Sequence, residues 1–208
     1  NSTGIDPNNA KENIMKKIII AAAVGMLVAG SVAAQESPWL VRARAVNLNM
    51  ANNDATGLGL TVNDKTIGEF DVSYFFNKNV AAELILTLPQ KQAVHAGASA
   101  IGSFKHLPPT LTLQYHFTDF QGYKPYVGAG INYTKITGDN LAAAYHLDSN
   151  SYGAAFQAGV DVPLTKQVSL NFDVKKVYIK TDVYDGATNK GSLKLDPVLV
   201  GVGVGYRF

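Results

Sequence analysis

Charged side chains recur at two-residue intervals in several short stretches, and this spacing limits the chemistry they can perform. A two-residue interval places side chains on one face of a β-strand. Charges gathered in this way could pair and fill the interior of a small barrel, or they could line a pore that conducts polar solutes. We favour pairing, because buried charges need partners. The residues concerned are Arg42, Arg44, Glu69, Asp71, Glu83, Asp161, Asp173, Lys175 and Arg207.

Serine and histidine give a weaker signal, for a lipid-modifying barrel enzyme. Such chemistry needs a nucleophile and a base within hydrogen-bond reach. His95 lies near Ser99 and His106 lies near Ser103, but neither spacing is diagnostic. The four histidines also lack a metal-ligand spacing, and the chain has no cysteine, which excludes disulfides and thiol chemistry. We therefore predict a protein that is not an enzyme and needs no cofactor or metal.

Alternation of apolar and polar residues predicts the elements that carry these charges. In the last stretch, valines and aromatic residues from Val198 to Phe208 share one face, while glycines and Arg207 occupy the other. Such a strand suits lipid outside and a crowded lumen inside. The predicted fold is all-β, an eight-stranded antiparallel transmembrane β-barrel of the bacterial outer membrane. Its strands are expected at residues 37–50, 66–76, 80–88, 110–118, 125–137, 152–162, 167–184 and 198–208.

The connections between these strands alternate between short and long, as expected when short turns face the periplasm. Aromatic residues gather near the short-turn end and predict an interfacial girdle there. They are Trp39, Phe75, Phe76, Phe117, Phe120, Tyr123, Tyr126, Tyr206 and Phe208. A second girdle would contain Tyr133, Tyr152, Tyr178 and Tyr184. The rival fold, a soluble β-sandwich or lipocalin-like barrel, would turn the apolar face inward, and periodicity alone does not separate the two.

The first part of the chain has the pattern of an export signal. Two lysines follow Met15, an uncharged stretch continues from Ile18, and small residues end it at Ala34. We expect residues 1–14 to be an upstream extension or a cloning remnant, residues 15–34 a cleaved signal peptide, and residues 35–208 the barrel. The net charge of +2 is too small to indicate a nucleic-acid partner.

Four motifs, in order along the chain, resemble the outer-membrane protein W family, which includes alkane-uptake proteins of hydrocarbon-degrading bacteria. They are residues 106–111 (HLPPTL), 125–133 (PYVGAGINY), 195–197 (LDP) and the ending 205–208 (GYRF). The resemblance implies an outer-membrane barrel that passively admits small hydrophobic solutes through an extracellular apolar funnel and releases them sideways into the membrane. Its expected partners are outer-membrane lipid, small hydrophobic solutes, and the barrel-assembly machinery through the C-terminal Phe208 strand. One departure is the absence of tryptophan from residues 138–151, which leaves the gating residues open.

Prolines mark where such a wall could open, because proline has no N–H to donate to a strand ladder. Taken alone, they more commonly end strands and shape loops, but with the resemblance we interpret them as an exit. Apolar residues in the loop at 89–108, and a short patch at 141–145 that we expect to be helical, would wall the funnel. The predicted substrate path is Leu88, Pro89, Phe104, Leu107, Pro108, Pro109, Leu111, Leu141 and Tyr145. A polar-solute pore, or a structural or receptor barrel without transport, stays open as an alternative.

Overall fold

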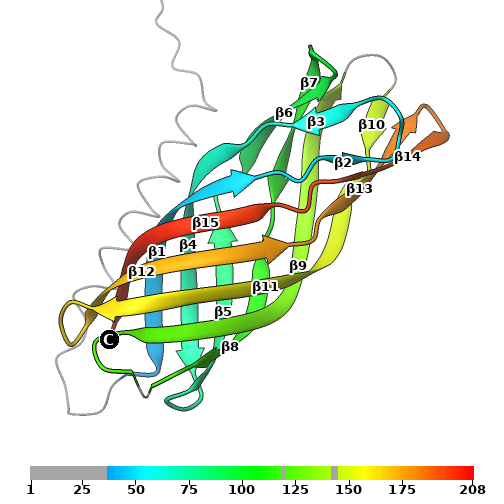
Figure 1. Ribbon diagram of the computed structural model, residues 1–208. Helices are drawn as coiled ribbons and strands as arrows, with labels where there is room; N and C mark the ends of the chain where they lie inside the picture. The colour runs from blue at the N-terminus through cyan, green and yellow to red at the C-terminus, as the bar shows by residue number, and fades with distance from the viewer. Residues whose placement is uncertain (1–36, 119, 142–144) are drawn as a thin grey trace, which may run out of the picture. The chain divides into compact units, whose positions relative to one another are not determined.

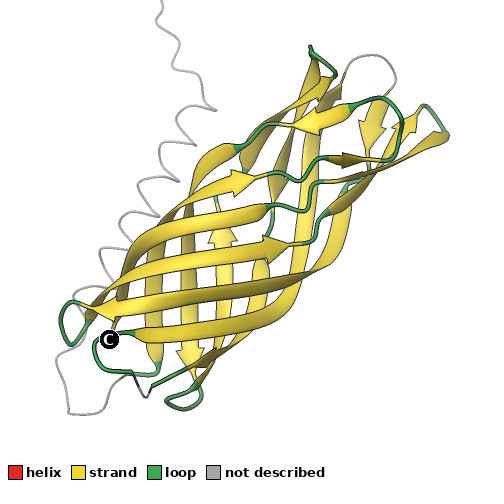
Figure 2. Ribbon diagram, in the orientation of Figure 1, coloured by secondary structure: helices red, strands yellow, loops and turns green. Residues whose placement is uncertain are grey.

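The computed structural model describes residues 37–118, 120–141 and 145–208, so the predicted signal peptide and upstream extension lie outside the described residues. Within those ranges every regular element is a strand, and no helix long and apolar enough to cross a membrane is present (Figure 2). The wall strands are β1 (Trp39–Asn49), β4 (Lys65–Phe75), β5 (Val80–Thr87), β8 (Thr110–His116), β9 (Lys124–Leu141), β11 (Asn150–Pro163), β12 (Val168–Val177) and β15 (Val198–Arg207). The other strands are β2 (Asn53–Asp54), β3 (Leu60–Val62), β6 (Gln90–Ala96), β7 (Ser99–Leu107), β10 (Tyr145–Leu147), β13 (Lys180–Asp185) and β14 (Thr188–Lys194).

The wall strands pair antiparallel in chain order and close on themselves (Figure 1). Closure comes from β15 pairing with β1, where Ala43 lies opposite Val204. The pairing of β9 with β11 completes the circle on the far side, with Ala129 opposite Phe156. A closed circle leaves no lateral edge of unpaired backbone groups, which hydrocarbon would not tolerate. The predicted eight-stranded antiparallel barrel is therefore confirmed, and the predicted strand ranges agree with the observed ones to within a few residues over most of the wall. The exception is the strand predicted at 167–184, which the structure divides into β12 and β13.

The side chains of the wall strands alternate as the sequence predicts. In β1, charged Arg42 and Arg44 are buried, while the intervening Ala43 is exposed. In β15 the valines point outward and the glycines point inward. The exposed large apolar side chains form an outer surface suited to lipid, with aromatic residues at both ends of it. At the short-turn end these aromatics include Trp39, Phe76, Tyr115, Phe117, Phe120 and Tyr123.

Two aromatic residues expected in the girdle instead point into the barrel. Tyr126 is 1% exposed and Phe75 is 7% exposed. Both belong to the inward-facing set of their strands, because Val127 on β9 and Tyr74 on β4 take the outward positions. The strict alternation of side chains along a strand therefore overrides the tendency of aromatics to gather at the interface.

The barrel extends beyond its wall at the end opposite the short turns, where the sequence suggested loops. The segment expected as an apolar loop forms the β6–β7 hairpin, and β13 and β14 form a second hairpin (Figure 1). Leu141 ends β9 and Tyr145 begins β10, so the helical expectation for 141–145 is wrong at both described ends. Residues 142–144 lie outside the described residues. These extensions continue the barrel's interior past the wall.

Candidate functional site

A network of charges fills the interior at the short-turn side, and Arg42 lies at its centre. Its guanidinium donates to Asp161 at 2.8 and 3.2 Å, to Asp71 at 3.2 Å and to Ser73 at 3.0 Å. A longer contact of 3.4 Å reaches Glu83. The strand register produces this arrangement, since Arg42 on β1 lies opposite Asp71 on β4. One fully buried cation thus serves carboxylates from three neighbouring segments.

Arg44 repeats the arrangement one step further along β1. Its guanidinium lies 2.9 Å from Glu69, 2.5 Å from Asp71 and 3.3 Å from Glu83, and its Nε donates to Asn171 at 2.6 Å. Glu83 is therefore shared between the two arginines. Glutamine and threonine side chains on β8 and β11 donate to its second oxygen. Such shared acceptors bind the strands on opposite sides of the lumen together.

Lys175 completes this set, which we call the charged network: Arg42, Arg44, Glu69, Asp71, Glu83, Asp161, Asp173 and Lys175. The ammonium group of Lys175 lies 2.6 Å from Glu69 and 2.7 Å from Asp173. Tyr126, which the sequence assigned to the girdle, donates its hydroxyl to Asp173 at 2.6 Å and accepts from Asn171 at 3.1 Å. The uncharged polar residues of the lumen were not predicted, because the sequence shows only which face of the strand such side chains occupy.

Arg207 was predicted as a lumen charge, but the structure places it apart from the charged network. It lies opposite Leu40 at the short-turn end, beyond Arg42 in the register. Its Nε donates to the carbonyl of Ser37 at 2.9 Å, and its guanidinium lies 4.2 Å from the ring centre of Phe75. The side chain is half-buried, so it covers the end of the lumen rather than the middle.

The other half of the interior is apolar. Sixteen buried residues form one cluster there, contributed by the upper parts of the wall strands and by the extending hairpins. We call this the apolar cluster: Val46, Leu48, Leu60, Val62, Ile67, Val94, Phe104, Ile136, Leu147, Ala155, Val177, Ile179, Val183, Leu193, Leu195 and Leu199. The side chains pack against one another rather than leaving an open funnel.

The barrel wall is interrupted beside the boundary between these two halves. Pairing of β5 with β8 stops where Ile85 lies opposite Thr110, and pairing of β6 with β7 starts where Gln90 lies opposite His106. Among the described residues, no backbone hydrogen bond crosses between these two points. The segments concerned are residues 86–89 and 107–109, here called the proline gap, with Pro89, Pro108 and Pro109 in them.

The predicted path residues divide into two groups on either side of the proline gap. The outer group, between 36% and 50% exposed, consists of Leu88, Leu107 and Leu111. The inner group, within or against the apolar cluster, consists of Phe104, Leu141 and Tyr145. Pro89 is exposed, whereas the carbonyl of Pro109 accepts from the side chain of Asn132 and the backbone of Tyr133. The outer group therefore borders the proline gap. Leu141 and Tyr145 lie further out, where they pair with Gly102 and Asp185 of the extending strands.

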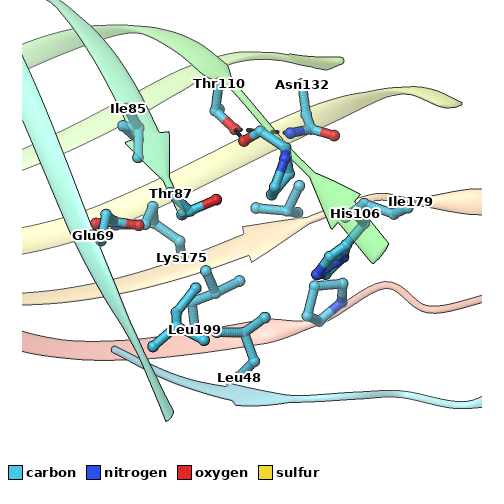
Figure 3. Close-up of a pocket in the computed structure, with 14 residues that line it drawn as sticks. Leu48, Glu69, Ile85, Thr87, His106, Thr110, Asn132, Lys175, Ile179 and Leu199 are labelled. Atoms are coloured by element: carbon cyan, nitrogen blue, oxygen red, sulfur yellow. Dashed lines mark hydrogen bonds and ion pairs between the residues drawn. The ribbon is translucent and has the colours of Figure 1, made fainter. Parts of the chain in front are cut away.

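A small cavity lies inside the proline gap, where the two halves of the lumen meet (Figure 3). Its volume is about 20 Å³, close to that needed for one water molecule. Glu69 and Lys175 of the charged network line it, as do Leu48 and Leu199 of the apolar cluster. Pro108 brings the proline gap to the same space. The cavity therefore touches all three features.

The histidines form no catalytic arrangement in the described part of the chain. No serine hydroxyl there is hydrogen-bonded to a histidine ring, and His106 has no partner on either ring nitrogen. The ring of His116 is bonded to Gln114 at 2.9 Å, and that of His146 stacks on Tyr184. Across the same residues, no group of three or more potential metal ligands is present.

A closed antiparallel barrel with an apolar, aromatic-bounded outer surface and a charged, hydrogen-bonded interior is a bacterial outer-membrane β-barrel. The sequence matches the OmpW family over residues 29–208, and the chain belongs to that family. The short turns therefore face the periplasm, and the hairpin extensions face outside.

Comparison with known proteins agrees with this assignment. The chain is 44% identical over 191 residues to the uncharacterized outer-membrane protein y4mB of Sinorhizobium fredii, covering 85% of this chain and 82% of that protein. It is 26% identical over 191 residues to the dibenzothiophene metabolism operon protein PahQ of Pseudomonas aeruginosa, covering 84% and 90%. The crystal structure of OprG from P. aeruginosa has the same fold, with a TM-score of 0.71, 23% identity, and coverage of 86% and 99%. Membership of this family is consistent with uptake of small hydrophobic molecules.

Proposed function

We propose that this barrel is a passive channel for small hydrophobic molecules, which enter at the extracellular end and leave sideways through the proline gap into the membrane. The observation that carries the proposal is the coincidence of three features at one depth. The charged network ends, the apolar cluster begins, and the wall is unpaired, all around one cavity. For an apolar solute that reached this depth, the most favourable move would be sideways into the membrane.

The charged network supports a sideways exit because it closes the axial one. Arg42 and Glu83 are fully buried at the middle of the lumen, and their bonds join β1, β4, β5 and β11. Passing an apolar solute through this network would leave buried charges without partners, at several kcal/mol for each ion. Ions would meet a similar barrier, since the charges of the network are already paired with one another.

The proline gap supports the exit because it can widen without breaking backbone hydrogen bonds. In an intact ladder, separating two strands in hydrocarbon costs several kcal/mol for each unpaired group. Residues 86–89 and 107–109 carry no such bonds across to each other. Leu88, Leu107 and Leu111 give the outer rim an apolar surface that continues into lipid.

The apolar cluster supports the entry route. Its contacts are non-directional, so side chains can separate and close again around a solute of similar character. The relative named for a dibenzothiophene metabolism operon fits a hydrophobic aromatic solute of this kind. With a cavity of about 20 Å³, the closed packing must part for each molecule that passes.

Uptake of a radiolabelled medium-chain alkane tests the route. Cells producing the barrel should take up alkane faster than cells without it. Leu107→Asp places a charge on the rim of the proline gap and should abolish the protein-dependent part of uptake. Leu164→Asp is the matched control, because this leucine is 62% exposed at a periplasmic turn far from the gap, and uptake should stay normal. Normal uptake by a folded Leu107→Asp barrel would refute the exit.

Single-channel conductance of the purified barrel separates the alternatives. The proposal expects little ionic current, because the charges that fill the lumen are paired with one another. Steady conductance without alkane uptake would establish a small polar pore instead. Absence of both signals would leave a structural or receptor barrel as the better description.

A further inference from the structure

Buried polar atoms without hydrogen-bond partners gather beside the proline gap. Among the described residues, eight buried side-chain atoms lack a hydrogen-bond partner, although one of them, an oxygen of Asp71, is ion-paired with Arg44. Five of the eight belong to three residues on β5, β6 and β7. They are the hydroxyl of Thr87, both ring nitrogens of His106 and both amide atoms of Gln92. A buried polar group without a hydrogen-bond partner destabilises the folded state. Three residues with such groups on neighbouring strands are therefore unusual in the interior of a membrane protein.

Two of these groups face the cavity. Thr87 is 8% exposed and His106 is 2% exposed, and both line it. Figure 3 shows them approaching the same space, with Thr110 and Asn132 along one side. Those two residues are already bonded to each other at 2.8 Å, so they have less to offer a ligand. Thr87 lies within the first segment of the proline gap, and His106 directly precedes the second segment, so the two residues come from opposite sides of it.

We propose that Thr87 and His106 form a binding site for the uncharged polar head of an otherwise apolar solute, such as an alcohol, aldehyde or ketone. The route by which the solute arrives rests on the proposed function, but the site itself does not. A neutral imidazole offers one donor and one acceptor, and the threonine hydroxyl offers both. Together they can satisfy a hydroxyl group completely and a carbonyl group through their donors.

The size and charge of the cavity select this class of head. A volume of about 20 Å³ accommodates one water-sized group and no hydrocarbon chain. The tail must then lie in the proline gap, against the exposed side chains of Leu88 and Leu107. An anionic head is disfavoured because Lys175 is already paired, and Glu69 lines the same space. An ammonium head would have to compete with Lys175 for Glu69.

Nitrogen-15 shifts of the His106 ring test the site directly in the folded barrel in lipid. Titration with 1-octanol should move the His106 ring resonances, because a ring nitrogen gains a hydrogen bond. Titration with octane, which has the same tail and no head, should leave them in place. His95 lies on β6 of the same hairpin outside the cavity, and its ring provides an internal control. Equal shifts with both probes, or none with 1-octanol, would overturn the polar site.

Binding of 1-octanol and uptake of octane by substituted barrels give a second test. We expect His106→Phe and Thr87→Val each to weaken 1-octanol binding about fivefold, the value of one hydrogen bond, while octane uptake is preserved. His95→Phe should change neither. Equal loss for both probes would assign the two residues a merely structural role and overturn the proposal. A ring shift with 1-octanol but no protein-dependent octane uptake would support the site and overturn the proposed function, so the two fail separately.

Discussion

The two halves of the lumen fill the same barrel in opposite ways. Toward the periplasm, the charged network joins strands through bonds such as the 2.8 Å contact between Arg42 and Asp161. Toward the outside, the apolar cluster fills the space with valine, leucine and isoleucine side chains. Charge-assisted hydrogen bonds hold a fixed geometry, whereas apolar contacts do not depend on direction. One half is therefore built to stay closed, and the other can part and close again.

The position of the proline gap explains why the difference between the charged network and the apolar cluster matters for function. Beside the charged network, β5 and β8 remain paired from Val80 to Ile85 without a break. The proline gap occurs where the charged network gives way to the apolar cluster. A break lower down would expose buried charges to lipid, and a break higher up would open to water. The division of the interior and the interruption of the wall are thus related. Substitutions in one half of the lumen can be compared with substitutions in the other.

The largest effect is expected from removing the central cation of the charged network. Arg42→Met leaves Asp71, Glu83 and Asp161 facing one another without their shared partner. Breaking a buried ion pair from one side costs about 3–5 kcal/mol of unfolding free energy. Urea unfolding of the barrel in lipid vesicles measures this loss.

Arg207→Met is the matched control for that substitution. Its guanidinium lies over Phe75 and bonds to the carbonyl of Ser37 at a half-buried end, so a smaller loss is expected. Equal losses for the two variants would mean that the charged network adds nothing beyond ordinary arginine packing, and the contrast between the halves would fail.

A smaller and more local effect is expected in the apolar cluster. Phe104→Ala removes a fully buried ring from β7 and leaves a cavity, at about 3 kcal/mol. Because the contacts are apolar and lie in an extension beyond the wall, the loss should be confined to the β6–β7 hairpin. Hydrogen exchange should accelerate there and stay slow in β1 and β15. Phe172→Ala, at an outward-facing ring of β12, should leave the hairpin's exchange unchanged.

The sequence was sufficient to predict the wall of the barrel, because every wall strand must satisfy lipid on one face and the lumen on the other. Because of these two requirements, segments such as 198–208 have a strict two-residue period. The extensions face water outside and are under no such requirement, so the β6–β7 hairpin was expected as a loop. Most of β13 was expected as the end of a single strand at 167–184, and β14 fell outside the predicted strands. The charged residues of the lumen could be predicted, since a charged residue within an otherwise apolar strand must face the interior.

Partners within the lumen were beyond the reach of the sequence. Which carboxylate meets Arg42 depends on register, and register depends on the whole closed circle of strands. Tyr126 resembles a girdle aromatic by its position near a short turn, but it shares the inward phase of Gly128 on the same strand. Thr87 carried no signal of its own, since its importance comes from facing His106 across the proline gap, a juxtaposition of segments that are distant in the sequence.

The smallest effect tests how tightly the charged network is packed. Gly203 lies opposite Arg44, and a methyl group there would meet the Ala43 carbonyl at 2.1 Å and the Arg44 side chain at 2.7 Å. We expect Gly203→Ala to lower the unfolding free energy by about 1–3 kcal/mol, because backbone must shift to accept it. Gly68→Ala, at an exposed position with nothing within 4 Å, should be neutral or slightly stabilising in the same urea unfolding measurement. If Gly203→Ala were as harmless as its control, the arginines of the charged network would have room to move, and the closed half of the lumen would be no more rigid than the half that opens.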